Sequence, residues 1–353
     1  MKILLSSHFF HPSIGGIEQV SLILAREFCA AGHEVRVVTT TRRSRDPTRP
    51  RPSFSSSIED EDEDDARSGR LQVIRRPSPL RLWQTVRWSD VVFHNNISLR
   101  FAWPLLTIRR PWVVAHHTWL TRTDGSTGWR DRLKRSALRF ATNISVSQQI
   151  AEHLGVPSIV TGNPYRDEIF RRDPECIRDR DLVFVGRLVS DKGLDFLLEA
   201  VSLLQKRAVI VTASVVGEGP LFSVLQRVSK DLRLESQIKF LGAKTGHELA
   251  ALLNRHRAIV LPSRWQEPFG LAALEGIACG CKAIVPDSGA FRETLGACAI
   301  LFEHENAVSL ADVIEVTLTQ KLDADYWKQA ERQLSQYEAK RVAARYLEIL
   351  KTA

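Results

Sequence analysis

The chain has 353 residues, of which 44% are hydrophobic and 25% charged, and its formal net charge is +8. These proportions are typical of a soluble globular protein, and the length allows two domains that each have a core. No run of about 18 apolar residues occurs, so no membrane-spanning helix is predicted. The apolar start, Met1 to Phe10, runs into a glycine turn without a small-residue cleavage site, and we interpret it as a first strand rather than a signal peptide.

The positive charge is concentrated in the first half of the chain. Residues 1–170 hold 24 Lys or Arg and 17 Asp or Glu, and seven of those acids form one run from Glu59 to Asp65. Such a surface suits an anionic partner, such as phospholipid head groups, a lipid diphosphate or a nucleic acid. A role limited to keeping the protein soluble is an equally good interpretation.

Strand and helix patterns alternate along the first half. Strands are predicted at 2–6, 35–40, 71–74, 91–93, 113–115 and 144–146, and a helix at 17–31 follows the Gly15-Gly16 turn. The first strand, helix and second strand form a βαβ unit, which predicts a parallel sheet with helices on both faces. Residues 42–70 break the pattern with Pro, Ser, Arg and the acidic run, and we interpret them as a solvated insertion.

The alternation restarts in the second half. Strands are predicted at 181–186, 209–216, 238–241, 258–261, 282–285 and 299–302, with helices at 194–206, 221–231, 248–254 and 269–278, and a closing helix at 326–350. Residues 161–180 have the composition of a linker. We therefore predict two Rossmann-like, doubly wound α/β domains, at 1–165 and 166–330, with 331–353 packing back towards the first. Two such domains place a ligand cleft at the carboxyl ends of their strands.

The segment from Glu267 to Glu275 brackets the start of one predicted helix with two carboxylates. At a rise of ~1.5 Å per residue the carboxylates lie ~12 Å apart, too far for the acid and nucleophile of a hydrolase but suited to two ends of an extended ligand. The amides of Phe269, Gly270 and Leu271 would point out of the helix start and form a seat for a phosphate. This combination suggests a nucleotide-sugar.

Several motifs, in order, resemble those of the family 4 retaining glycosyltransferases, also called glycosyl transferases group 1. They are Pro12-Ser-Ile-Gly-Gly-Ile-Glu18 with Gly32-His-Glu-Val35, Val185-Gly-Arg-Leu-Val-Ser-Asp-Lys-Gly193, Val216-Gly-Glu-Gly-Pro220, and the pair Glu267 and Glu275. The resemblance covers nearly the whole chain. It implies the GT-B fold, in which two Rossmann-like domains face each other across a cleft and the C-terminal one binds the donor. Pro164 to Phe170 departs from the family pattern, which we expect to alter the hinge rather than the chemistry.

The resemblance also implies roles for residues of the second domain. Arg187 and Lys192 would contact the donor diphosphate, Glu275 would accept hydrogen bonds from the ribose, and Glu267 would face the transferred hexose. Fixed cations and helix-start amides stabilise a departing diphosphate without a metal. For Glu267 a carboxylate that merely complements the helix dipole is a compatible interpretation, and Gly217 belongs to the donor-binding loops.

In the first domain the resemblance selects His117, rather than His116, as the residue near the 6-hydroxyl of the sugar. It follows the apolar strand 113–115, whose end opens on the cleft, although packing is the ordinary fate of a lone histidine. Gly15 and Gly16 would let the first loop approach the donor or the acceptor closely.

No metal site and no cofactor are predicted. Asp60 with Asp62, and Asp62 with Asp64, match an Asp-x-Asp metal motif, but both lie inside a low-complexity run. Cys279 and Cys281 lack a second Cys pair or spaced histidines, so we expect small buried thiols in a reducing cytoplasm.

Residues 129–140 predict a basic amphipathic helix, in which Trp129, Leu133, Ala137 and Phe140 share one face. This helix suits a membrane-surface contact or a lipid-diphosphate acceptor. Packing of the apolar face on the sheet is the alternative.

Together these features predict a cytoplasmic retaining glycosyltransferase that moves a hexose from a nucleotide-diphospho-sugar to a glycan or lipid-linked acceptor. It would act at the inner membrane face, in the synthesis of cell-surface polysaccharide or glycolipid. A nucleotide-sugar epimerase of the same architecture and a basic nucleic-acid-binding protein are the alternatives. The second of these leaves Arg187, Lys192, Glu267 and Glu275 unexplained.

Overall fold

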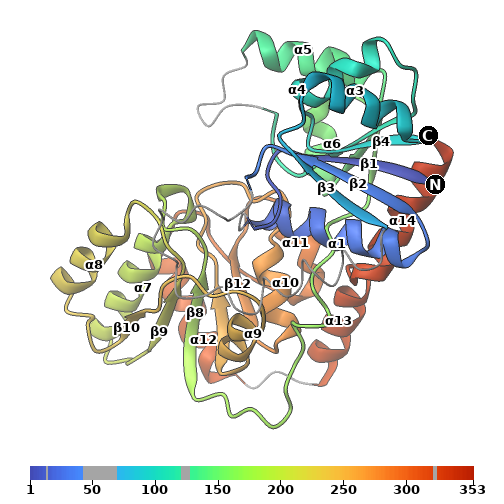
Figure 1. The fold of residues 1–353 in the computed structure, drawn as a ribbon. Coiled ribbons are helices and arrows are strands. Elements are labelled where there is room, and N and C mark those ends of the chain that lie inside the picture. Colours follow the sequence, from blue (N-terminus) through green and yellow to red (C-terminus); the bar gives the residue numbers. More distant parts are fainter. Residues whose placement is uncertain (13–14, 43–69, 121–127, 321–323) are drawn as a thin grey trace. The chain divides into compact units, whose positions relative to one another are not determined.

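The computed structural model describes residues 1–12, 15–42, 70–120, 128–320 and 324–353, which form two compact α/β units (Figure 1). Unit 1 comprises residues 1–164 and 339–353, and unit 2 comprises residues 165–338. The insertion expected at 42–70 lies outside the described residues except for its first and last residue. The acidic run with Asp60, Asp62 and Asp64 lies outside them entirely.

Unit 1 is built on a parallel sheet with the strand order β3-β2-β1-β4-β5-β6-β7. Its strands are β1 (Lys2–Ser7), β2 (Glu34–Thr39), β3 (Leu71–Arg75), β4 (Val91–Asn95), β5 (Trp112–His116), β6 (Thr142–Ser145) and β7 (Ser158–Val160). In the register of the sheet, Ile3 of β1 pairs with Val35 of β2 and with Val91 of β4. The order therefore reverses between β1 and β4, the kind of switch point at which open α/β sheets bind ligands.

Alternation along the strands sends apolar side chains to both faces of this sheet. Ile3 and Leu5 pack in one cluster with α1 (Gly16–Ala30) and α14 (Ala339–Thr352), whereas Leu4 packs in another with residues of α3 (Pro79–Trp88) and α4 (Leu99–Ala102). The turn η1 (Trp103–Leu106) and helix α5 (Trp129–Leu138) lie on the α3 side (Figure 1). Helix α6 (Gln148–Leu154) connects β6 to β7.

Unit 2 has a second parallel sheet, in the order β10-β9-β8-β11-β12-β13. Its strands are β8 (Arg180–Val185), β9 (Ala213–Val216), β10 (Ile238–Phe240), β11 (His256–Val260), β12 (Lys282–Pro286) and β13 (Ala299–Phe302). Its helices are α7 (Leu194–Lys206), α8 (Phe222–Asp231), α9 (Gly246–Asn254), α10 (Leu271–Ala278), α11 (Phe291–Leu295), α12 (Ala307–Thr319) and α13 (Ala324–Ser335), with short turns η2 (Ser190–Lys192) and η3 (Gly296–Cys298). The order reverses between β8 and β11.

The two sheets confirm the predicted doubly wound α/β class, with local differences. The strand expected at 209–216 begins only at Ala213, and the helix expected at 326–350 is wrong as a single element. The chain leaves α13 at Ser335, the backbone amide of Tyr165 donates to the carbonyl of Tyr337 at 3.1 Å, and α14 begins at Ala339. This backbone pairing outside the helical pattern separates the two helices, so that α13 belongs to unit 2 and α14 to unit 1.

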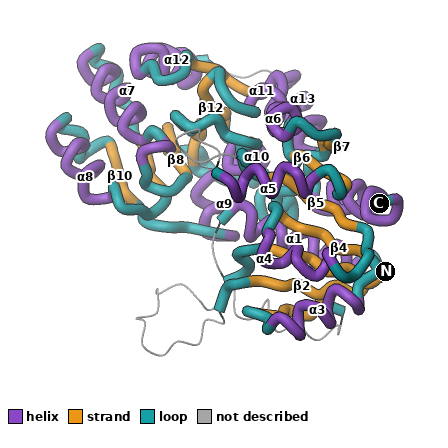
Figure 2. Tube along the Cα trace, turned by 90° about the horizontal axis from the view of Figure 1, so that it is seen from above, coloured by secondary structure: helices purple, strands orange, loops and turns teal. Residues whose placement is uncertain are grey.

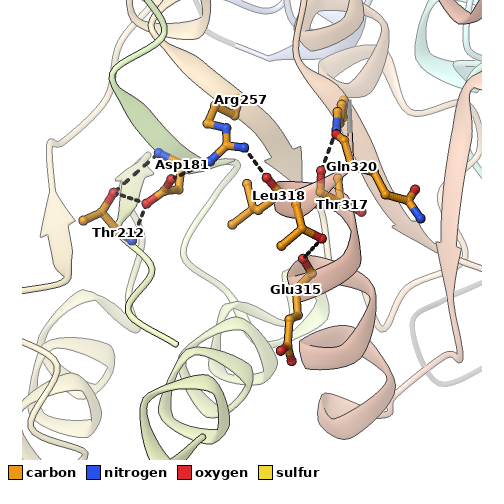
Figure 3. A network of polar contacts seen from close by, with 9 residues as sticks. Asp181, Thr212, Arg257, Glu315, Thr317, Leu318 and Gln320 are labelled. Atoms are coloured by element: carbon orange, nitrogen blue, oxygen red, sulfur yellow. Dashed lines mark hydrogen bonds and ion pairs between the residues drawn. The ribbon is translucent and has the colours of Figure 1, made fainter. Parts of the chain in front are cut away.

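Polar side chains at the amino ends of the unit 2 strands tie α12 to the sheet (Figure 3). Asp181 accepts hydrogen bonds from the amide and hydroxyl of Thr212 at 3.0 and 2.9 Å, and it pairs with Arg257 at 3.4 Å. The other end of the Arg257 guanidinium donates to the carbonyl of Leu318, and Lys282 Nζ donates to that of Gln320 at 2.6 Å. These contacts satisfy the carbonyl of Leu318 in the last turn of α12 and that of Gln320, directly after the helix.

The helices of both units are short. The longest that the structure describes, α1, has 15 residues, and none of the described helices combines the length and apolarity needed to cross a bilayer. Cys279 and Cys281, at the end of α10, are buried free thiols, as expected.

Candidate functional site

The loops that follow β8 and β11 meet at the switch point of unit 2. Gly193 ends the first loop at a φ of 65°, and a Cβ atom there would lie 1.9 Å from the carbonyl oxygen of Pro262. The amides of Arg264 and Trp265 donate to the carbonyl of Asp191 at 2.9 and 3.2 Å. Only glycine permits this close approach of the two loops. Because Gly193 directly follows Lys192, the contact determines the position of the lysine.

Lys192 and Glu267 form an ion pair across these two loops, between Nζ and Oε1. Both side chains are partly buried, with exposed fractions of 24% and 16%. Ser263 stands beside them, with its hydroxyl 2.9 Å from Oε1 of Glu267 and 3.0 Å from the carbonyl of Asp191. The structure thus brings together two predicted site residues, with a serine that links them through the backbone of η2.

Arg264 holds the same two loops from the side. Its guanidinium donates to the carbonyl of Ser190 at 2.9 Å and to the carboxylate of Asp195 at 2.8 Å, and it lies 4.1 Å from the ring centre of Phe196. These partners belong to η2 and to the first turn of α7. Arg264 therefore anchors the loop that carries Glu267 to the loop that carries Lys192.

Arg187 and Gly217 lie where the loops after β8 and β9 cross. The Arg187 side chain is exposed, and its guanidinium makes no hydrogen bond or ion pair with other described residues. Gly217 approaches the neighbouring loop so closely that a Cβ atom would lie 1.8 Å from the carbonyl oxygen of Gly186. Close packing of the two loops thus explains the glycine at 217. The exposed guanidinium of Arg187, on the neighbouring loop, is available to a ligand.

Helix α10 begins one residue after Gly270. Gly270 has a φ of 91°, and a Cβ atom there would lie 2.6 Å from the ring of Phe291. Phe269 is buried, with its ring edge-on to that of Tyr337 at 5.1 Å, and Leu271 is the first helical residue. The amides of Ala273 and Leu274 donate to the carbonyl of Gly270 at 3.0 and 3.4 Å. The phosphate seat expected from the amides of Phe269, Gly270 and Leu271, ahead of them, stays a prediction.

Glu275 is buried in the second turn of α10, with an exposed fraction of 6%. One carboxylate oxygen, Oε1, has no hydrogen-bond partner. Burial raises the pKa of Glu275 to about 8, and the nearby charge of Arg166 opposes this rise. A buried carboxyl group whose Oε1 lacks a hydrogen-bond partner is costly to the fold, and it is suited to form hydrogen bonds with a ligand.

In unit 1, His117 lies just past the end of β5 with an exposed fraction of 4%. Its Nε2 contacts Oδ1 of Asn95, and its amide donates to Oδ1 of Asn96 at 2.9 Å. Because the Asn95 amide nitrogen donates to the carbonyl of Ile17 at 3.3 Å, Oδ1 is the atom that faces the histidine. Nε2 therefore carries the proton, and Nδ1, which has no partner, is a buried acceptor.

Burial lowers the pKa of His117 to about 3, and the neighbouring His116 lowers it further. His117 is therefore neutral at physiological pH. His116, the residue rejected on sequence grounds, lies at the end of β5 and contacts Asn143 through Nε2 at 3.1 Å.

Gly15 and Gly16 begin α1 in unit 1. A Cβ atom at Gly15 would lie 2.3 Å from the Glu18 carboxylate, whereas one at Gly16 would meet no atom within 4 Å. Residues 13 and 14 of the same motif lie outside the described residues. The contact at position 15 is with the end of a flexible side chain, and the backbone there is extended, with a φ of 177°, so the local structure requires glycine at neither position.

Several polar residues at strand ends escaped the sequence analysis. They are Asn95 and Asn96 after the apolar part of β4, Asn163 after β7, and Ser263 after β11. The same argument that selected His117, a polar side chain where a parallel strand ends, would have found each of them.

Two family models match the chain, and together they span most of it. The model for glycosyl transferases group 1 matches residues 166–334, and the model for glycosyltransferase family 4 matches residues 14–156. The first therefore covers most of unit 2, and the second covers most of unit 1.

Curated relatives carry glycosyltransferase names. A glycosyltransferase of Bacillus subtilis is 30% identical over 162 residues, which are 45% of each chain. A glycogen synthase of Mycobacterium tuberculosis is 25% identical over 383 aligned positions, covering 94% of this chain and 90% of that protein. The GDP-mannose-dependent alpha-(1-6)-phosphatidylinositol dimannoside mannosyltransferase of the same organism is 26% identical over 335, covering 85% and 84%.

Solved structures share the fold over the full length. Anabaena HepE in complex with UDP and glucose superposes with a TM-score of 0.80 at 19% identity, covering all of both chains. Sucrose-phosphate synthase from Thermosynechococcus elongatus gives 0.78 at 19% identity, covering 99% and 98%. These likenesses confirm the predicted GT-B fold. With the two family models, they show that the chain is an enzyme that belongs to the glycosyltransferases of group 1 and family 4.

Proposed function

We propose that this glycosyltransferase moves a hexose, with retention of its anomeric configuration, from a nucleotide-diphospho-sugar to a glycan or lipid-linked acceptor. The observation that carries the proposal is the Lys192–Glu267 pair at the switch point of unit 2, together with the buried, partly unsatisfied carboxylate of Glu275. The relatives support the donor class, since one is named for GDP-mannose and one solved neighbour holds UDP and glucose.

The charges around the loop after β8 suit a departing diphosphate. When the bond from the sugar to the β-phosphate breaks, negative charge develops on the leaving oxygen. Lys192 is a cation held by its ion pair with Glu267, and Arg187 is an exposed cation on the same loop. The backbone amides around Gly270, at the start of α10, would contribute as well. In this proposal these groups supply the stabilisation, and no metal ion or cofactor is needed.

Glu275 and Glu267 would bind the two ends of the donor. The Glu275 carboxylate, which lacks a donor on Oε1, would accept hydrogen bonds from the ribose hydroxyls. Glu267, held by Lys192 and Ser263, would face the hexose and stabilise positive charge at its anomeric carbon. Hydrogen bonds from a ligand would offset the cost of burying the Glu275 carboxyl group, and this gain favours binding.

The reaction proposed is a substitution on one face of the sugar. The bond between the anomeric carbon and the phosphate oxygen breaks, the acceptor oxygen bonds to the same face, and its proton passes to the leaving phosphate oxygen. The neutral His117, with Nδ1 open, would accept a hydrogen bond from the 6-hydroxyl of the hexose and orient the ring. The reaction would take place in the cytoplasm, at the inner membrane face, in the synthesis of cell-surface polysaccharide or glycolipid.

The stereochemical claim is tested on the product. We expect transfer from UDP-, GDP- or ADP-hexose to give a product whose anomeric configuration equals that of the donor, as read from the NMR coupling constant of the anomeric proton. An inverted product would refute retention. Thermal-shift screening with the same three classes of donor identifies the base, and stabilisation by none of them would contradict the donor assignment. Conversion of the donor without any acceptor would favour the epimerase.

We predict that Lys192→Ala lowers the turnover number for transfer by at least about a hundredfold, because the variant loses a cation at the leaving group. The partly exposed side chain allows the fold to persist, which circular dichroism would check. Lys328→Ala is the matched control, since it breaks an exposed ion pair with Asp325 on α13 and is expected to leave turnover unchanged. Near-normal turnover in Lys192→Ala would contradict the assignment of Lys192 to the leaving group.

A further inference from the structure

Helix α5 presents apolar side chains to solvent instead of to the sheet. Trp129, Leu133 and Phe140, which we call the α5 ridge, have exposed fractions of 70%, 50% and 83%. They lie within about 40° of one another around the helix axis at 3.6 residues per turn, with Phe140 just past the helix end. Leu138, on the opposite side, is fully buried and packs the helix onto unit 1. The packing alternative for the amphipathic face is therefore wrong for these three residues.

Two cations flank the ridge. Arg132 and Arg139 are exposed, and neither guanidinium has a hydrogen-bond or ion-pair partner within the described ranges. Arg135, on the inner side of the helix, instead donates to the carbonyl of His153 at 3.3 Å. The charges beside the ridge are thus available to an external anion.

The surrounding segment carries the net charge of the whole chain. Residues 79–140 contain eleven Lys or Arg and three Asp or Glu, a net of +8, so the remaining residues are together neutral. Leu80 of α3 and Leu106 of η1 are also exposed, with exposed fractions of 65% and 89%. Helix α3 lies on the same side of the unit 1 sheet as α5 (Figures 1 and 2). The segment that contains the ridge therefore combines basic charge with large exposed apolar side chains.

We propose that the α5 ridge docks unit 1 on an anionic lipid bilayer. Trp, Leu and Phe side chains gain free energy by entering the boundary between head groups and acyl chains, while neighbouring Arg side chains remain at the phosphates. A nucleic acid would use the cations but would leave the aliphatic Leu133 without a suitable contact. In a two-fold pairing of ridges, Arg132 and Arg139 would face their own copies, which opposes a second copy of this chain as the partner.

Membrane docking deepens the proposed function, and it rests on that function only for the reason why the enzyme would bind a membrane. A lipid-linked acceptor is held in a membrane, so an enzyme bound to that membrane searches two dimensions rather than three. The physical basis for docking, in contrast, is the exposed ridge and its cations, and it holds whatever the enzyme transfers.

The test measures vesicle binding by the full chain, without donor or acceptor. We expect sedimentation with phosphatidylglycerol–phosphatidylcholine vesicles, and at least about tenfold weaker binding to phosphatidylcholine alone. Trp129→Ala combined with Leu133→Ala and Phe140→Ala should weaken binding to the anionic vesicles by about tenfold or more. Arg132→Glu with Arg139→Glu should do the same.

Matched controls lie on unit 2. Ile177→Ala with Ile210→Ala and Val308→Ala removes apolar side chains of 80%, 67% and 51% exposure. Arg227→Glu with Lys230→Glu, on exposed positions of α8, changes the net charge by the same amount as the arginine variant. Both controls should bind vesicles as the unmodified chain does.

Three results would overturn the proposal. They are unchanged vesicle binding by the ridge variant, equal loss of binding by the unit 2 controls, and a dimer in sedimentation that the ridge variant converts to a monomer. Competition by a single-stranded RNA oligonucleotide that binds more tightly than the vesicles would assign the face to nucleic acid instead. Because no result depends on sugar transfer, failure here leaves the proposed function standing, and failure of transfer leaves membrane docking standing.

Discussion

Glu275 occupies a helix position whose neighbours Ala273, Leu274 and Ile277 are all apolar and buried. An apolar residue at 275 would pack there without the cost of removing a carboxyl group from water. The fold keeps a carboxyl group whose Oε1 has no partner, which is the behaviour of a residue retained for binding rather than for stability. The same position therefore links the stability of unit 2 to pH.

We predict that Glu275→Gln stabilises the free protein at high pH and not at low pH. The folded pKa of about 8 lies above the ordinary value of 4.5, so the unfolded chain releases this proton first and stability falls as pH rises from about 4.5 to about 8. The variant does not titrate there, and it should gain about 3–5 kcal/mol relative to the unmodified chain at pH 9, but little at pH 4.5. Urea unfolding at both pH values measures the difference.

The exposed Glu199 on α7 supplies the control for that measurement, because Glu199→Gln should give the same small change at both pH values. An equal gain for Glu275→Gln at pH 4.5 and pH 9 would contradict the titration of a buried carboxyl. The variant should also bind donor more weakly, since an amide donates as well as accepts.

Ser263 was absent from the sequence-based site, yet it contacts both Glu267 and the backbone of η2. Ser263→Ala should lower kcat by about tenfold and change the donor KM by less than about threefold, because Glu267 loses its fixed position while the diphosphate cations remain. Ser263→Thr keeps the hydroxyl and should recover most of kcat. A rise in KM at constant kcat would assign the serine to donor binding instead.

At the scale of elements, the loops at the carboxyl ends of β8, β9 and β11 are held by close glycine contacts. Gly193, Gly217 and Gly270 all have positive φ, and each would clash if it carried a Cβ atom. Since these loops carry Lys192, Arg187 and the start of α10, the glycines determine the geometry of the site without touching a ligand.

We predict that Gly193→Ala lowers the free energy of unfolding by at least about 3 kcal/mol and abolishes transfer, because the Cβ atom would lie 1.9 Å from the Pro262 carbonyl at a φ of 65°. Gly32→Ala provides the comparison, since Gly32 has a φ of 88° and open space around it. That variant should lose only about 1 kcal/mol and keep its activity. Denaturant unfolding and a transfer assay distinguish the two variants. Equal losses of stability in both would show that the cost comes from the positive φ alone and not from the contact with Pro262.

Much of the fold and some of the site could be predicted from the sequence. Period and length identified most strands, and the position of Glu267 ahead of a helix start follows from Gly270 and the apolar run after it. The burial of Glu275 could not be predicted, because it depends on how α10 packs in unit 2. The exposure of Trp129 and Phe140 was equally hidden, since an amphipathic pattern does not say which face meets the sheet.

At the scale of the molecule, the last helix of the described chain completes the first unit. Val342, Tyr346 and Leu350 of α14 are buried in the same cluster as Phe28 and Phe93. The centre of the Tyr346 ring lies 5.6 Å from that of Phe93, at an interplanar angle of 65°. Unit 1 is therefore discontinuous in sequence, whereas residues 165–338 of unit 2 are continuous.

We predict that Tyr346→Ala destabilises unit 1 by about 3–5 kcal/mol through the cavity it leaves, while unit 2 is unaffected. Calorimetry should then show a lower transition for one unit, and limited proteolysis should cut residues 1–164 before residues 165–338. Tyr346→Phe keeps the ring and should change stability by less than about 1 kcal/mol. A uniform shift of both units in Tyr346→Ala would contradict separate cores.

The discontinuity of unit 1 has a consequence for how the protein is made. A ribosome delivers residues 1–164 first, but the helix that covers Phe28 and Phe93 emerges only after all of unit 2. For that interval α1 covers this face of the first sheet without α14, and the apolar side chains that α14 later buries form a surface of the kind that chaperones bind and that promotes aggregation. Unit 2 can close its core as soon as its own residues are free of the ribosome, so the unit that is synthesised first is completed last.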